Sequence, residues 1–289
     1  MRIILAVLNI AILLALPACN KEQPVYMDLG LVEESRLNEI SGLECSQLNG
    51  EMFWLHNDSG DSAQIFAMDG NGHNLGRFKL SNIQNRDWED IAIGPGPVEG
   101  QSYIYIGDIG DNEAIYNYKY IYRFKEPKLD FNKIPCQGII DEIETITFQY
   151  PDGPRDAETL MIDPLTKDLI IISKREDSVH AYILPYPQDT QSTIIPEQIA
   201  TMPLTQLTAG DISESGTKII IKNYDNIFYW HRNPDQSLHD VFLEKPENLP
   251  YVREPQGEAI CWSSDEKGYF TSSEEADGVE ARLYFYPCE

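Results

Sequence analysis

Short apolar runs alternate with polar or glycine-containing segments along almost the whole chain after residue 40. Runs of this length, bounded by turn residues, are typical of β-strands rather than of helices. Turn-forming segments separate them at 70–72, 94–97, 163–164 and 213–216. No long segment has the 3.6-residue period of an amphipathic helix, so we predict an all-β chain.

The apolar runs fall into five units with the same order of strands, which is typical of a repeat architecture. The first strands of the units, here called inner strands, are expected at 41–45, 88–93, 157–162, 210–212 and 257–261. The second strands are expected at 52–55, 103–106, 169–172, 218–221 and 268–271. The third strands are expected at 64–67, 120–123, 180–183, 226–229 and 282–285.

Fourth-strand candidates lie between the units at 75–80, 144–150, 198–202 and 239–243. The fifth unit has no fourth strand of its own, but residues 25–29 near the N-terminus supply a spare one. A polar insert at 126–142 explains why the second unit is the longest. Together these units predict a five-bladed β-propeller closed by an N-terminal strand, which also hides free strand edges. A six-bladed ring with one degenerate blade and a β-sandwich are the alternatives.

The first residues are typical of a targeting segment. Met1-Arg2 is followed by an apolar run at 3–16, too short to span a bilayer comfortably, and then by Leu16-Pro17-Ala18-Cys19. This arrangement resembles a bacterial lipoprotein signal, in which Cys19 becomes the lipidated first residue. We therefore expect a signal peptide at 1–18, a single propeller domain at 19–289, and a lipid-anchored protein that faces the periplasm or the cell exterior. Cleavage by ordinary signal peptidase after Ala18 is the alternative.

Acidic residues outnumber basic ones, with 47 Asp and Glu against 22 Lys and Arg, and the formal net charge is −25. Nucleic acids and anionic membrane surfaces attract cationic proteins, so we expect no nucleic-acid partner and no membrane contact other than the lipid anchor. Hydrophobic residues make up 42 % of the chain, which is enough for a packed core. We expect a monomer whose ligand is a small molecule or a protein.

The cysteines and histidines do not form a zinc motif, because no two cysteines have the C-x-x-C spacing and the five histidines are scattered. Four cysteines remain after Cys19, and they allow three disulfide pairings. Cys45 and Cys261 fall at nearly the same position on the inner strands of the first and last units. They could form a bridge, although neighbouring inner strands could also hold them too far apart.

Many of the acids collect at one face of the predicted ring. In a propeller, the loop before each inner strand and the loop between the second and third strands lie on the same face. The candidate metal ligands in these loops are Asp58, Asp61, Glu89, Asp108, Asp111, Glu158, Asp211 and Glu258. Crowded carboxylates repel one another, and calcium, which takes six to eight oxygen ligands, would neutralise them. We therefore predict a calcium site; ordinary Asp-containing turns and hydrogen bonds between blades are the alternatives.

Four of these acids are predicted to occupy one position of the repeat. They are Glu89, Glu158, Asp211 and Glu258, and the first unit has Ser41 at the same position. Of the four, the three glutamates are the candidates for a catalytic base if the protein is an enzyme.

Basic residues are also expected on this face. Arg155 precedes Asp156, whereas Lys174 and Lys222 follow the second strands of neighbouring units. Pairing with carboxylates is the simplest role for these cations. The alternative is that Arg155, Lys174 and Lys222 bind an anionic ligand, with the two lysines clamping a phosphate beside a metal.

Four motifs carry a resemblance to a known group of proteins. They are the segments at 54–61, 85–92, 107–112 and 150–158, which read WLHNDSGD, NRDWEDIA, GDIGDN and YPDGPRDAE. With these motifs the chain resembles a group of exported bacterial β-propeller proteins. The resemblance implies the fold but no activity. In architecture the chain is more distantly similar to calcium-activated apyrases and to β-propeller phytases.

Three functions are compatible with this reading. The first is a calcium-binding propeller that recognises a ligand or a protein at its acidic face without chemistry. The second is a calcium-dependent phosphohydrolase acting on nucleotides or phosphate esters, and the third is a glycoside hydrolase, which needs a pair of carboxylates. The large negative charge favours the first, because it repels a polyanionic substrate unless a metal is bound.

Overall fold

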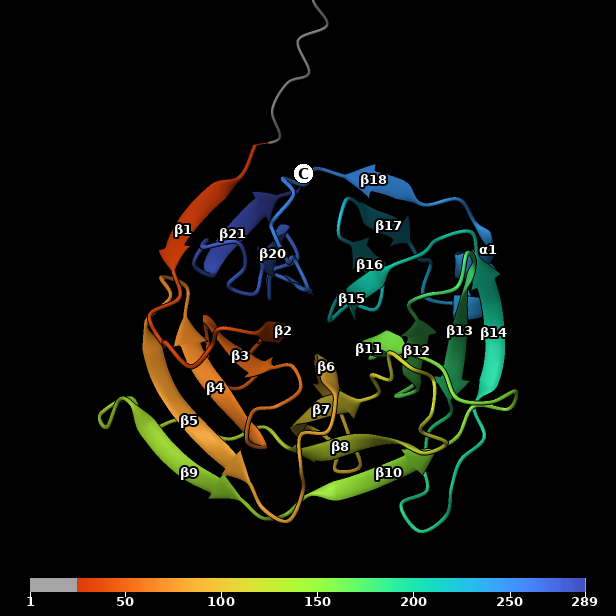
Figure 1. Cartoon of the computed structure of the whole chain (residues 1–289), viewed down its shortest axis with the longest axis horizontal. Helices are drawn as coiled ribbons and strands as arrows, with labels where there is room; N and C mark the ends of the chain where they lie inside the picture. The colour runs from red at the N-terminus through yellow and green to blue at the C-terminus, as the bar shows by residue number, and fades with distance from the viewer. Residues whose placement is uncertain (1–24, 289) are drawn as a thin grey trace, which may run out of the picture.

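The computed structural model describes residues 25–288, and in it five mainly antiparallel sheets are arranged as blades around a central axis (Figure 1). Blade 1 contains β2 (Ile40–Cys45), β3 (Met52–Asn57), β4 (Gln64–Asp69), β5 (Asn74–Leu80) and an added strand, β9 (Cys136–Ile140). Blade 2 contains β6 (Trp88–Pro95), β7 (Ser102–Asp108), β8 (Lys119–Lys125) and β10 (Glu144–Phe148). Blade 3 contains β11 (Ala157–Ile162), β12 (Leu169–Ser173), β13 (Val179–Leu184) and β14 (Glu197–Met202).

The last two blades complete the ring. Blade 4 contains β15 (Leu207–Ile212), β16 (Lys218–Asn223), β17 (Ile227–His231) and β18 (Glu247–Leu249). Blade 5 contains β19 (Ala259–Trp262), β20 (Gly268–Ser272), β21 (Arg282–Pro287) and the N-terminal strand β1 (Met27–Leu31). Because β1 pairs antiparallel with β21, the predicted five-bladed ring and its closure by an N-terminal strand are both confirmed.

One prediction about the outer strands was wrong, and one strand was not predicted. Residues 239–243, expected to be the fourth strand of blade 4, belong instead to the short helix α1 (Leu238–Leu243), which packs against β14; the fourth strand is β18. The helix begins at Ser237, whose side chain caps the backbone N–H of Asp240. The polar insert at 126–142, for which no strand was predicted, contributes β9, which pairs in parallel with β5.

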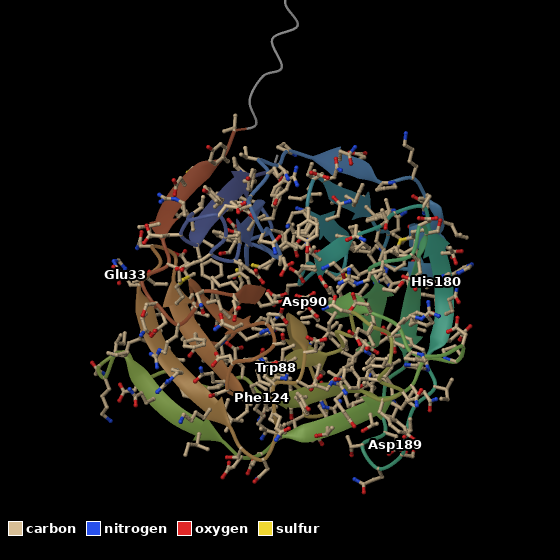
Figure 2. All side chains as sticks on the ribbon, in the orientation of Figure 1. Glu33, Trp88, Asp90, Phe124, His180 and Asp189 are labelled. Carbon is tan, nitrogen blue, oxygen red and sulfur yellow. The ribbon has the colours of Figure 1, made fainter. Side chains whose placement is uncertain are left out.

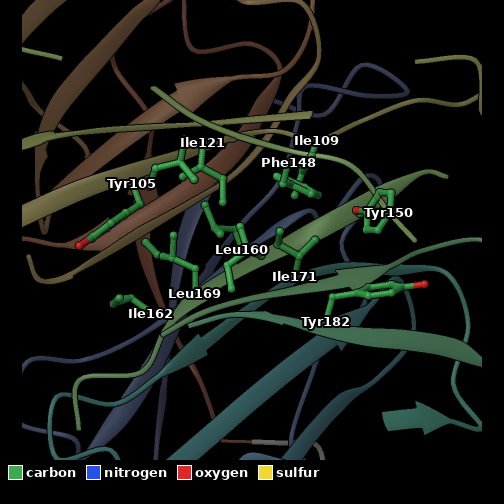
Figure 3. Close-up of a cluster of buried hydrophobic side chains, with 14 of the residues drawn as sticks. Tyr105, Ile109, Ile121, Phe148, Tyr150, Leu160, Ile162, Leu169, Ile171 and Tyr182 are labelled. Atoms are coloured by element: carbon green, nitrogen blue, oxygen red, sulfur yellow. The ribbon is translucent and has the colours of Figure 1, made fainter. Parts of the chain in front are cut away.

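The hydrophobic core consists of layers between neighbouring blades. Figure 3 shows the layer between blades 2 and 3, where Tyr105, Leu160 and Ile171 are buried beside Phe148 and Tyr182. Each second strand is nearly all apolar because both of its faces are covered by other blades. No helix among residues 25–288 is long and apolar enough to cross a membrane.

The inner strands of four blades share an irregularity that positions the candidate site. At the start of β2, β6, β11 and β15, the pairing with the second strand skips one residue, as in a β-bulge. The residues left unpaired are Ser41, Glu89, Glu158 and Thr208. A bulge changes the direction of a side chain relative to the usual alternation between the two faces of a strand. Two of the four bulge residues, Glu89 and Glu158, are glutamates.

Candidate functional site

The glutamates at the bulges of blades 2 and 3 meet at one end of the channel. Glu89, Asp156 and Glu158 each place a carboxylate oxygen within 4.8 Å of the others. Asp58, Asp87 and Glu89 form a second group with the same spacing. We call these five residues the acidic mouth. Glu89 is the member that belongs to both groups.

Two of the five carboxylates already have a cation of the protein beside them. Lys174 donates a hydrogen bond to Glu158, and both side chains are buried. Arg175 donates to Asp156 at 2.5 Å, and Asp156 also accepts the backbone N–H of Asp111. The group made by Glu89, Asp156 and Glu158 is therefore largely neutralised by side chains of blade 3.

The group made by Asp58, Asp87 and Glu89 has no such cation. Glu89 is only 4 % exposed, and among residues 25–288 no group donates a hydrogen bond to its carboxylate. Burial, and after it the charge of Glu158, raise the pKa of Glu89 well above its usual range. Burial also raises the pKa of Asp58 to about 6, and the pKa of Asp87 is raised for the same reason. Burying a charged carboxylate without a partner costs free energy, so we expect these three acids to bind a proton or a cation.

A glycine shapes this uncompensated group. Gly110, in the loop after β7, lies directly against the carboxylates of Glu89 and Asp87. A Cβ atom added at Gly110 would collide with Oε1 of Glu89 and would stand 2.6 Å from the carboxylate of Asp87. The absence of a side chain at Gly110 therefore lets the two carboxylates face each other across the loop backbone.

Glu258 lies beside the acidic mouth and is linked to it by a chain of hydrogen bonds. The Tyr224 hydroxyl donates to Glu258 at 2.6 Å, and Lys174 donates to the Tyr224 oxygen at 3.0 Å. Burial, and next the charge of Glu258, raise the pKa of Glu274 to about 8. Burial alone would lower the pKa of Lys174, but Glu158 and Glu258 raise it above its ordinary value. Lys174 is thus the central cation on this side of the channel.

Three predicted metal ligands on the same face have other partners. Asp61 accepts hydrogen bonds from the Asn57 and Gln64 side chains. Asp108 pairs with Arg86 at 3.0 Å. Asp111 accepts the backbone N–H groups of residues 115 and 116 and pairs with a lysine, Lys119, that is fully buried. These contacts match the alternative of structural turns and ion pairs, and none of the three belongs to the groups that could hold a metal.

Asp211 does not occupy the repeat position that was predicted for it. The bulge of blade 4 holds Thr208, and Asp211 lies three residues further along β15, where its carboxylate accepts the backbone N–H of Trp262. There it lines a cavity of about 240 Å³ together with Glu44, at the opposite end of the channel. The sequence alignment of the repeats was therefore shifted in blade 4, where the Thr208 hydroxyl instead donates to the carbonyl of Gly257 in blade 5.

The channel itself is crossed by the carboxylate of Asp90, which lies near the centre of the ring in Figure 2. Asp90 accepts backbone N–H groups from Leu160 of blade 3 and Gly210 of blade 4, and it is 1 % exposed. This residue connects three blades and separates the acidic mouth from the opposite end of the channel.

The predicted anion-binding residues are all engaged within the protein. Lys222 is fully buried and donates to the carbonyl of Gly257, and its burial lowers its pKa to about 8. Arg155 pairs with Asp152 and Glu176 and lies over the rings of two buried tyrosines. Of the three, only Lys174 contacts the acidic mouth. The predicted lipidation residue, Cys19, lies outside the described residues.

The sequence reasoning placed Asp87 and Asp156 on the correct face but did not select them as ligands. A signal for them was present, because residues 86–89 and 155–158 both read Arg-Asp-x-Glu. In each case the aspartate and the glutamate two positions later end in the same group of carboxylates. Tyr224 was also missed, and a lone tyrosine in a polar loop gives no comparable signal.

The fold and the site together define a five-bladed β-propeller with an acidic channel mouth. A scan against protein-family models and a search of curated protein sequences both gave no match. Among solved structures, the chain is similar to a chain in the crystal structure of a nidogen/laminin complex. The two are 12 % identical, with a TM-score of 0.44, and the alignment covers 81 % of this chain and 72 % of that chain. At this level the similarity carries no argument about what the protein does.

Proposed function

We propose that this protein is a calcium-binding β-propeller that recognises a ligand or a protein at its acidic mouth. The observation that carries the proposal is Glu89, a buried carboxylate that no described group of the protein compensates and that stands between two further carboxylates. Among residues 25–288, basic side chains form ion pairs with Asp156 and Glu158, but none forms an ion pair with Asp58, Asp87 or Glu89. This difference supports a bound cation at the second group.

The ligand chemistry of this group suits calcium. Calcium binds oxygen ligands at about 2.4 Å, so two oxygens on opposite sides of the ion lie up to about 4.8 Å apart. The carboxylate oxygens of Asp58, Asp87 and Glu89 fall within that span. Ca²⁺ also accepts carbonyl and water oxygens, which a loop at a channel mouth can supply. When bound, the ion would offset the mutual repulsion of the acids and present a positive centre to an anionic group of a ligand.

Recognition is favoured over phosphate chemistry because of the lysines. A phosphate clamp formed by Lys174 and Lys222 was the basis of the phosphohydrolase hypothesis. Lys222 is buried against Gly257, and Lys174 is held by Glu158 and Tyr224, so both lysines are committed to contacts within the fold. Phosphohydrolase and glycoside hydrolase activity stay predictions from the sequence, without a specific structural observation in their favour.

The test is calcium binding by the purified chain after treatment with EDTA. Isothermal titration calorimetry should detect binding of Ca²⁺, and the melting temperature should rise with calcium concentration because only the folded state has the site. Glu89→Gln and Asp87→Asn should each weaken binding at least tenfold. The proposal fails if the wild-type protein neither binds Ca²⁺ nor melts at a higher temperature in its presence.

The matched control is another acid from the same face. Asp61→Asn removes a charge from the loop that also carries Asp58, but Asp61 belongs to neither group, and the remaining amide oxygen can still accept the hydrogen bonds from Asn57 and Gln64, so calcium affinity should stay within about twofold of the wild type. Equal losses in Asp61→Asn and Glu89→Gln would indicate diffuse attraction by the acidic face rather than a defined site.

A further inference from the structure

Two cysteines meet where the ring closes, far from the acidic mouth. Cys45 ends β2, the inner strand of blade 1, and Cys261 lies on β19, the inner strand of blade 5. The two strands are neighbours in space although 216 positions separate the cysteines in sequence. Their Sγ atoms are 3.8 Å apart. In the described part of the chain no other pair of cysteine sulfurs is in contact, which singles out one of the three possible pairings.

The surroundings allow the two sulfurs to approach. A disulfide has an S–S distance of about 2.05 Å, so the gap must shorten by roughly 1.8 Å. Cys261 is fully buried, whereas Cys45 is partly exposed and lines a cavity of about 360 Å³ with Phe53, Phe270 and other residues of blades 1 and 5. Space beside Cys45 permits its side chain to rotate toward Cys261, and it also gives a small reagent access to the Cys45 sulfur.

We propose that Cys45 and Cys261 form a disulfide bond that covalently joins the first and last blades. The reaction partner is a low-molecular-weight disulfide. The Cys45 thiolate attacks one sulfur of that disulfide, forming a mixed disulfide and releasing one thiolate. The Cys261 thiolate then attacks the Cys45 sulfur and releases the second thiolate, and the two protons lost by the cysteines go to the two released thiolates. The two cysteines are oxidised by two electrons, and the reagent is reduced to two thiols.

The bond would complement the closure made by the N-terminal strand. The pairing of β1 with β21 joins the ends of the chain within blade 5, toward the outer side of the ring (Figure 1). The Cys45–Cys261 bond joins blades 5 and 1 at their inner strands. Opening the ring between these blades would then require a covalent bond to break, so the oxidised protein should resist unfolding more strongly than the reduced one.

The test uses the full chain in its reduced form, treated with oxidised glutathione. Peptide mass spectrometry without reducing agent should find the Cys45 and Cys261 peptides linked, with two hydrogens fewer than the separate peptides. The urea midpoint of unfolding should rise by roughly 1 M and return to the original value with dithiothreitol.

Variants separate this bond from other oxidation. A chain with C19S, C136S and C288S retains only the proposed pair and should show the full rise in midpoint. Adding C45S to that background should abolish it, and the melting temperature of the reduced chain shows whether the variant is folded. The proposal is overturned if Cys45 and Cys261 stay alkylatable, if Cys45 carries only glutathione, if other pairings dominate, or if the C45S chain shows the same rise.

Discussion

At the scale of single residues, Glu89 differs from the other buried glutamates in having no donor. Glu126, for comparison, is 5 % exposed and accepts hydrogen bonds from Trp54 and Asn49. Glu158 and Glu258 accept hydrogen bonds from Lys174 and Tyr224. A buried carboxylate without such partners lowers the stability of the fold unless something external compensates it.

This difference predicts opposite effects of two equivalent substitutions in calcium-free protein at pH 8. Glu89→Gln removes the free-energy cost of either burying the Glu89 charge or protonating it at pH 8, and its new N–H groups can donate to Asp58 and Asp87, so the free energy of unfolding should increase by about 1–2 kcal/mol. Glu126→Gln should instead decrease it by about 1 kcal/mol, because charge-assisted hydrogen bonds are weakened. Urea unfolding with EDTA present measures both, and a loss of stability in Glu89→Gln would contradict the account of Glu89.

The candidate site was predictable in its location but not in its membership. Glu89 and Glu158 were found because they follow the repeat, and the structure places both in bulges. Asp211 was assigned to the wrong repeat position because a bulge adds one unpaired residue that sequence periodicity does not reveal. In blade 4 the bulge residue is Thr208, but the sequence alignment of the repeats placed Asp211 at that position. Which carboxylates lack a partner depends on side chains from three blades, and sequence spacing contains no such information.

At the scale of elements, the inner, second and third strands were predicted well and the outer strands less well. The inner and second strands are buried on both faces, and the second strands in particular contain short apolar runs, such as Leu169–Ile172 in β12. Residues 239–243 were taken for a strand because a short, mostly apolar segment does not distinguish a strand from one or two helical turns. Strand β9 was missed because its side chains alternate between partly buried and exposed in a polar insert.

Removal of the N-terminal strand β1 should lower the stability of the fold by a large amount for so short an element. Deleting residues 1–31 would leave β21 with a free edge and would remove the ladder hydrogen bonds of β1, worth about 1 kcal/mol each. We expect the stability to fall by about 3 kcal/mol, or roughly 6–12 °C in melting temperature. A chain that lacks residues 1–24 keeps β1 and is the control. Equal melting temperatures for the two truncated chains would show that β1 contributes nothing to closure.

At the scale of the whole molecule, the acidic mouth should make stability depend on pH in an unusual direction. The pKa of Glu274 is raised to about 8, and that of Glu89 is raised well above its usual range, in both cases chiefly by burial. The folded state therefore holds protons that the unfolded state has already released. Folding takes up protons, so stability should increase as the pH falls from 8 to 6.5.

The pH window is limited on both sides by buried bases. Burial lowers the pKa of His56 to about 4, so below pH 6.5 only the unfolded state protonates this histidine, and this opposes the increase in stability. Burial also lowers the pKa of Lys222 to about 8, so the stability of the fold decreases as the pH falls toward 8 from above. Melting temperatures measured with EDTA at pH 6.5 and 8 test the prediction. Saturating calcium should reduce the slope, since the ion replaces the protons, and a higher melting temperature at pH 8 in EDTA would contradict it.

The pairing of β1 with β21 also dictates when this protein can finish folding during synthesis. Of the described strands, the ribosome makes β1 first and β21 last, so the strand that closes the ring has no partner until the other strands of the propeller have been made. Until then the first strand is free to pair with other strands, including those of neighbouring nascent chains. The four blades between them can form before β21 emerges, but the ring can close only after β21 has been made. A chain whose synthesis stops before β21 would therefore be left with an open ring and an unpaired first strand.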